Sequence, residues 1–171
     1  MNMVVLVGDS LSGKTVFAHV GCRIEVPMNV FRSTQAEVFY FDSTGKVIVV
    51  PGTASDEVLS QVCDNADGVM ILYTKKQGVP SALKWLRRLE NTVSNLRSVP
   101  MLICHHKQVH AGTSFDRRHT NMLTRYANAE HADTSVRYTA GTVDCFNRVF
   151  TRIRRQHPSP LVLREGAHTP H

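Results

Sequence analysis

The stretch GDSLSGKT, residues 8–15, decides the fold of this 171-residue chain. It places one glycine four residues before a Gly-Lys-Thr triplet, the spacing of a phosphate-binding loop. Glycines allow such a loop to curl so that consecutive backbone N–H groups point at phosphate oxygens. The alternative is a glycine-rich turn without function. The residues expected to bind phosphate are Gly8, Asp9, Ser10, Leu11, Ser12, Gly13, Lys14, Thr15 and Val16.

Two side chains of the loop have separate expected roles. Lys14 places a positive charge beside the outer phosphates, and the Thr15 hydroxyl is a ligand for Mg²⁺. A helix is expected to begin near Lys14, so that its positive dipole end also faces the phosphates. The sequence therefore predicts a nucleotide with its magnesium ion.

Strand and helix patterns alternate along the rest of the chain. Short apolar runs are typical of buried strands, and apolar residues three or four apart indicate helices. The pattern predicts an α/β fold with a six-stranded, mostly parallel sheet and five helices over both faces. The strands are expected at 3–7, 36–41, 46–50, 68–74, 100–106 and 135–139, and helices from Lys14 and at 81–96, 115–129 and 142–155.

Length and composition favour one ordinary globular domain over residues 1–157, followed by a flexible tail, 158–171. No apolar run approaches the length of a membrane span, and Asn2 and the terminal sequence AHTPH exclude two common lipid anchors. The four cysteines form no C-x-x-C pair, which favours a reducing, cytoplasmic environment without zinc.

The net charge of +6 comes largely from arginines near the end of the chain. A solvated helix face is the simplest interpretation of this charge. An acidic protein partner is the alternative, and we do not expect nucleic acid as a partner.

In length, hairpin position and helix order, residues 1–157 resemble a Ras-like small GTPase, a P-loop NTPase. Thr34 lies where that family has the switch I threonine that binds Mg²⁺, so Thr15 and Thr34 are the expected metal ligands. The Asp-x-x-Gly motif matches residues 49–52, where Gly52 is kept as a phosphate contact but Val49 replaces the aspartate. Thr53 stands where the family has the glutamine that orients the attacking water.

The guanine-binding motifs of the family have also changed. Residues 105–108, His-His-Lys-Gln, replace Asn-Lys-x-Asp, and residues 139–141, Thr-Ala-Gly, replace Ser-Ala-Lys. A metal site at the two histidines is disfavoured, because neighbours on a strand point to opposite faces. The residues expected to contact the base are His105, His106, Lys107, Thr139, Ala140 and Gly141.

These changes separate holding a nucleotide from hydrolysing it. The resemblance implies GTP or GDP bound with Mg²⁺, while the groups that place water at the γ-phosphate have gone. Since those groups supply several orders of magnitude in rate, we expect at most a slow GTPase, and no catalytic residue is assigned.

Three stretches resemble a narrower family, the Rab-like small GTPase subunit of intraflagellar transport complex B. They are SGKTVFA after the loop, STQ with Thr34, and MLICHHK at the expected base site, and ADGVMILYT (66–74) also fits. The resemblance implies a chain, monomeric alone, that docks on coiled-coil subunits of that complex in the cilium or flagellum and its basal body. The alternatives are an active GTPase switch in vesicle or ciliary trafficking, and a small kinase-like P-loop enzyme.

Overall fold

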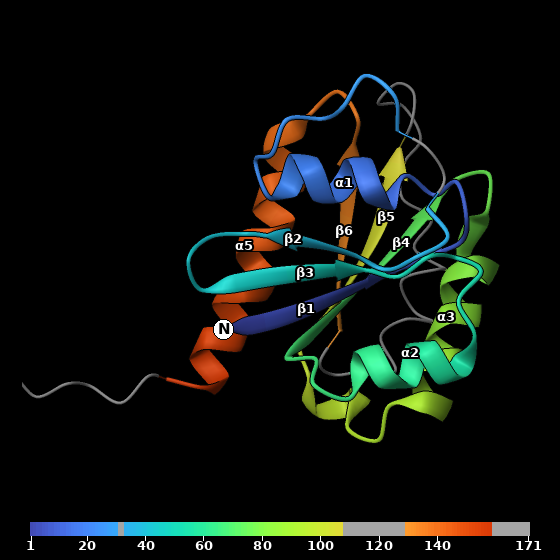
Figure 1. Cartoon of the computed structure of the whole chain (residues 1–171), viewed down its shortest axis with the longest axis vertical. Coiled ribbons are helices and arrows are strands. Elements are labelled where there is room, and N and C mark those ends of the chain that lie inside the picture. Colours follow the sequence, from blue (N-terminus) through green and yellow to red (C-terminus); the bar gives the residue numbers. More distant parts are fainter. Residues whose placement is uncertain (31–32, 108–128, 159–171) are drawn as a thin grey trace, which may run out of the picture.

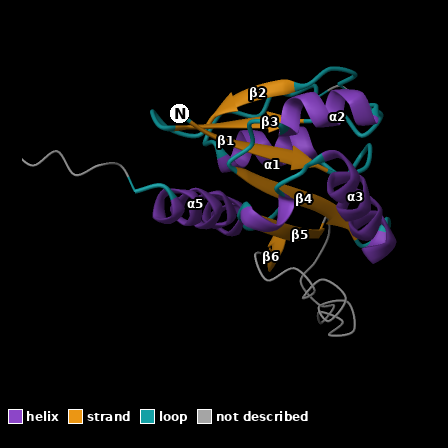
Figure 2. Ribbon diagram, turned by 90° about the horizontal axis from the view of Figure 1, so that it is seen from below, coloured by secondary structure: helices purple, strands orange, loops and turns teal. Residues whose placement is uncertain are grey.

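The computed structural model describes residues 1–30, 33–107 and 129–158. Six strands form one sheet, and Figure 2 shows them in the order β2-β3-β1-β4-β5-β6. Strand β2 runs antiparallel to β3, and the other neighbouring strands are parallel. The strands are β1 (Asn2–Val7), β2 (Glu37–Tyr40), β3 (Gly45–Val49), β4 (Gly68–Thr74), β5 (Met101–Lys107) and β6 (Ala129–Ser135).

Helices cover both faces of the sheet, which confirms the predicted α/β class (Figure 1). Helices α1 (Lys14–Gly21) and α5 (Thr139–Gln156) share a core with one face. Helices α2 (Asp56–Cys63) and α3 (Gly78–Thr92) pack on the other, and a short 3₁₀ helix, η1 (Leu96–Ser98), follows α3. The described residues therefore hold four α-helices rather than five; the helix expected at 115–129 lies outside them except for Ala129, which begins β6.

The alternating burial of β1 explains why the sheet needs helices on both sides. Met3, Val5 and Val7 join the core beneath α2 and α3, whereas Val4 and Leu6 join the core beneath α1 and α5. Successive side chains of a strand point to opposite faces, so a continuous apolar run requires cover on both.

The sixth strand lies six residues earlier than predicted, since it begins at Ala129 rather than at residue 135. Only Ala132 in it is a buried apolar residue. Two of its polar side chains hold it to neighbouring elements: Glu130 accepts a hydrogen bond from Arg148, and Thr134 is hydrogen-bonded to His106. A search for apolar alternation misses a strand of this kind.

The chain changes direction within the sheet at β1. From β1 it moves outward to β2 and β3, and then it crosses to β4, β5 and β6 on the other side. Ligands of open α/β sheets bind at the carboxyl ends of the strands where the order reverses. Here that position belongs to residues 8–13, which connect β1 to α1.

The late arginines bind other parts of the chain. Arg148 and Arg152 both pair with Glu130, and Arg154 pairs with Asp42. The four cysteines are buried free thiols, and burial raises the pKa of Cys22 and Cys63 to about 12. Over residues 1–30, 33–107 and 129–158, no helix is long and apolar enough to cross a membrane.

Candidate functional site

The loop from Gly8 to Gly13 makes a tight turn over the carboxyl end of β1. Leu11 has φ 65° and Gly13 has φ 89°, both in the left-handed region. The Ser12 N–H donates to the Asp9 carbonyl oxygen across the turn, at 3.2 Å. A left-handed leucine is an uncommon conformation of the kind that concentrates at ligand sites. The backbone thus has the curl that the sequence motif predicts.

The Lys14 ammonium group lies inside this curl. Its Nζ donates hydrogen bonds to the carbonyl oxygens of Gly8, at 2.7 Å, and Asp9, at 2.8 Å. Only 7% of the residue is exposed. A buried cation held by the loop backbone is already positioned for an anion at the loop, so binding costs little side-chain ordering.

Gly52, in the turn after β3, touches the phosphate-binding loop. A Cβ added at Gly52 would lie 2.3 Å from the Ser10 nitrogen and 2.7 Å from its Oγ. No side chain fits in that space. This close approach supports the prediction that Gly52 belongs to the same site as residues 8–16.

Asp9 connects the loop to α3. Its carboxylate accepts hydrogen bonds from Ser81 Oγ at 2.7 Å, from Trp85 Nε1 at 3.0 Å and from Lys84 Nζ. Burial raises the pKa of Asp9, but the hydrogen bonds from Lys84, Ser81 and Trp85 outweigh it and leave the pKa below its ordinary value. The loop is therefore tied to α3 by an ionised side chain.

Trp85 is fully buried, so it supports the site rather than marking a partner surface. The Arg88 guanidinium lies over its ring, 4.4 Å from the centroid. Arg88 also donates to the Ala54 carbonyl oxygen at 2.7 Å and to Asp56 at 2.9 Å. One cluster on α3 thus joins the loop to the residues that begin α2.

A cavity of about 690 Å³ opens beside the loop. Seven predicted phosphate contacts line it: Ser10, Leu11, Gly13, Lys14, Thr15, Val16 and Gly52. Gly8, Asp9 and Ser12 lie outside its lining, where Asp9 faces α3 and Ser12 is buried. The lining also includes residues that were not among the predicted phosphate contacts, namely Val30, Ser33, Gln35, Glu37, Val49, Pro51, Thr74, Lys76 and Gln77.

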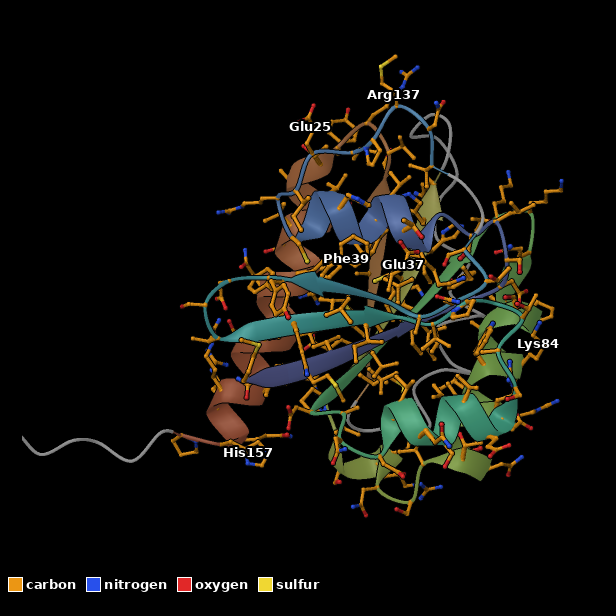
Figure 3. The ribbon with its side chains drawn as sticks, viewed as in Figure 1. Glu25, Glu37, Phe39, Lys84, Arg137 and His157 are labelled. Carbon is orange, nitrogen blue, oxygen red and sulfur yellow. The ribbon has the colours of Figure 1, made fainter. Side chains whose placement is uncertain are left out.

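Glu37 is the most informative of these additional residues. The Thr15 hydroxyl donates to Glu37 Oε1 at 3.1 Å, from the first turn of α1 to the beginning of β2. Figure 3 shows Glu37 close to α1. No sequence motif of a phosphate or metal site includes this position, so Glu37 could not be identified from the sequence alone.

Thr34, the second expected metal ligand, is exposed and does not line the cavity. The Ser33 hydroxyl donates to the Gln35 carbonyl oxygen at 2.7 Å and accepts from the Gln35 N–H at 3.2 Å. This local turn places Ser33 and Gln35 along the cavity and Thr34 outside it. Thr34 would have to turn inward to reach a metal beside Thr15.

The two histidines at the end of β5 have different surroundings. His106 is buried below the loop, with its Nδ1 hydrogen-bonded to Thr134 Oγ1 at 2.9 Å and its ring edge-on to Phe17. Burial first, and then the charge of His105, lower its pKa to about 4. A neutral His106 therefore supports the loop from underneath at physiological pH.

His105 points to the opposite face, as expected for a neighbour on a strand. Its ring stacks on Tyr73, and its Nδ1 lies 3.3 Å from Asp133. Burial lowers the pKa of His105, although Asp133 opposes the shift. Lys107 Nζ lies 3.5 Å from the same carboxylate. The structure thus separates His106, at the loop, from His105 and Lys107, at Asp133.

The second predicted base-binding motif, residues 139–141, begins α5 instead of following β6 directly. Because β6 ends at Ser135, the segment after the strand is Ser135-Val136-Arg137, where the Val136 N–H donates to the Lys107 carbonyl oxygen. In the observed register of β6, Ser135 pairs with Lys107 of β5. Neither histidine, Lys107 nor residues 139–141 line the cavity.

The donors at the cavity fit a phosphorylated ligand with a hard divalent cation. Lys14 is a buried cation, and Thr15 and Glu37 offer oxygen atoms of the type that Mg²⁺ prefers. Among the described residues no group of three or more His, Cys, Asp or Glu side chains could hold a metal. A cation here would thus depend on phosphate oxygens and water for most of its ligands, as Mg²⁺ commonly does.

Comparison with known proteins gives no family. No protein-family model matches the chain, and no curated protein matches it.

Proposed function

We propose that this protein is an atypical Ras-like small GTPase that binds GTP or GDP with Mg²⁺ and hydrolyses GTP slowly or not at all. On the resemblance of SGKTVFA, STQ and MLICHHK, we further propose that it serves intraflagellar transport complex B. There it would dock on coiled-coil subunits according to its bound nucleotide, in the cilium or flagellum and its basal body.

The observation that carries the nucleotide proposal is the position of Lys14. Its ammonium group is buried within a curled loop, at the topological switch point of the sheet and beside a cavity of about 690 Å³. An antiparallel β2 at the edge of an otherwise parallel sheet also suits a small-GTPase domain.

The proposal of slow hydrolysis is supported by the residues after β3. Val49, buried and apolar, stands at the position of the expected carboxylate, and Thr53 follows Gly52. Without a group that orients water, the γ-phosphate lacks a large part of the stabilisation that working GTPases provide.

Lys14→Ala tests nucleotide binding. Titration with fluorescent GDP and GTP is expected to show that the variant binds at least about a hundredfold more weakly, because a charge-assisted contact to phosphate is lost. Arg87→Ala is the control, since it removes an exposed positive charge on α3 and is expected to leave the affinity unchanged. Equal affinity of Lys14→Ala and the wild type would refute the proposal, and stronger binding of ATP than GTP would refute the family assignment.

Partner docking is tested separately, with purified coiled-coil subunits of the complex. The wild type loaded with GTP is expected to bind the immobilised subunits, and nucleotide-free Lys14→Ala is expected not to bind them. The reason is that a γ-phosphate and its metal would order the segment around Thr34. Equal retention of a confirmed nucleotide-free protein would contradict the proposed dependence on nucleotide.

A further inference from the structure

We propose that Glu37, on β2, supplies the metal-binding carboxylate of this site in place of the aspartate that Val49 has replaced. The inference rests on the proposed binding of a nucleotide with Mg²⁺, and it names a ligand that no sequence motif assigns.

The pairing of β2 with β3 places Glu37 where a substitute is needed. Glu37 lies directly opposite Val49 in this antiparallel pair. Residues directly opposite in such a pair project from the same face of the sheet. Val49 is 3% exposed and lines the cavity, and Glu37 lines it too. The two positions therefore face the same space.

The contact between Glu37 and Thr15 shows how far apart the two proposed ligand oxygens lie. Thr15 Oγ1 and Glu37 Oε1 lie 3.1 Å apart. Two ligands at adjacent corners of a Mg²⁺ octahedron, with bonds of about 2.1 Å, lie about 3 Å apart. The two oxygens are thus spaced as a pair of ligands before any metal binds.

The length of the Glu37 side chain suits a ligand that lies on β2 instead of β3. Strand β2 lies one place further from β1 than β3 does, and neighbouring strands are about 4.8 Å apart. A carboxylate on β2 must therefore reach further than one on β3. Glutamate has one more methylene group than aspartate, and the hydrogen bond from Thr15 shows that Glu37 reaches the first turn of α1.

Ligation by Glu37 would change which elements a bound metal connects. A carboxylate on β3 would join the metal to the turn that leads to α2, whereas Glu37 joins it to β2 and residues 33–36. Nucleotide release would then loosen the β2 edge of the sheet, while α2 stays held by Arg88 through Ala54 and Asp56.

The test is the affinity of Mn²⁺ for the GDP complex, measured by electron paramagnetic resonance. Glu37→Gln keeps a hydrogen-bond acceptor for Thr15 but loses the charge, so a purely structural role would survive it. The variant is expected to bind Mn²⁺ at least about tenfold more weakly, with GDP affinity in EDTA within about threefold of wild type. Glu25→Gln is the control, because Glu25 is an exposed carboxylate that does not line the cavity and lies apart from Glu37 in Figure 3.

Glu37→Asp separates ligation from simple charge attraction. It keeps the negative charge but withdraws it by one methylene, so direct ligation predicts a loss of Mn²⁺ affinity close to that of Glu37→Gln. Full affinity in Glu37→Asp, or unchanged affinity in Glu37→Gln with an unchanged melting temperature, would overturn the assignment while leaving nucleotide binding intact. A wild-type chain that binds no GDP would overturn both.

Discussion

At the scale of single residues, the site depends on atoms that lie unusually close to the loop backbone. Lys14 fills the curl from inside, and Gly52 presses on Ser10 from outside. His106 lies below, where a Cβ added at Gly13 would be 3.8 Å from its ring. Because the loop is enclosed on these sides, small changes at its neighbours should alter its shape.

Gly52→Ala is expected to destabilise the fold by about 1–3 kcal/mol and to weaken GDP binding at least tenfold, since overpacking forces backbone shifts. Gly141→Ala is the matched control, because a Cβ there meets nothing within 4 Å and the residue lies in α5. That change is expected to be neutral or stabilising by up to about 1 kcal/mol. Chemical denaturation compares the stability of the two variants, and equal stability would contradict the close approach of Gly52. Fluorescent GDP titration then compares Gly52→Ala with the wild type.

His106 should make stability depend on pH. Its folded pKa of about 4 lies below the ordinary value of about 6.5, so the unfolded chain binds the proton more readily between these values. The stabilisation is complete above about pH 6.5 and is lost as the pH falls towards 4, by about 3 kcal/mol at most.

Urea unfolding at pH 7 and pH 4.5 gives the free energy of unfolding of the wild type and of His106→Gln. Subtracting one from the other at each pH removes the contributions of His105 and His131, which both proteins share. Between pH 7 and pH 4.5 the wild type should lose about 1–3 kcal/mol more free energy of unfolding than the variant loses. An unchanged difference between the two proteins would show that His106 is not buried in its neutral form.

At the scale of elements, the loop is clamped to α3 through Asp9. Asp9→Ala would leave the buried Trp85 N–H and the Ser81 hydroxyl without this acceptor, at an expected cost of about 1–3 kcal/mol. Asp64→Ala, at the exposed end of α2, should change stability by less than about 0.5 kcal/mol. Thermal unfolding compares them, and an Asp9→Ala variant as stable as the Asp64→Ala variant would show that the clamp contributes nothing.

How well each element could be predicted depends on how its side chains are held. Strands β1 and β4 are buried on both faces, so their apolar runs located them. Strand β6 is held by polar partners on α5 and β5, and its position was wrong by six residues. Local patterns carry no information about such partners, which come from distant parts of the chain.

The candidate site also contains residues that the sequence could predict and residues that it could not. The loop was predictable because its spacing is a local signature, and the structure gathers residues 8–16 and Gly52 at one place. Glu37 and the Asp9 clamp depend on strand register and on contacts over 70 residues apart, such as Asp9 with Trp85. No local motif could have identified them.

At the scale of the whole molecule, one end of the sheet carries every group that the proposed phosphate site needs but lacks two groups that the proposed GTPase relatives use in hydrolysis. Lys14, Thr15 and the loop backbone provide the grip, while Val49 and Thr53 stand where a GTPase places its aspartate and glutamine. This combination is the reason we propose that the protein holds GTP without hydrolysing it quickly.

The most direct test is to load the purified protein with one equivalent of GTP and Mg²⁺ and to identify the retained nucleotide by chromatography over several hours. We predict that the protein retains nucleotide and that most of it is still GTP at the end. Retention of no nucleotide would contradict the proposed binding, and complete conversion to GDP within minutes would contradict the proposed slow hydrolysis.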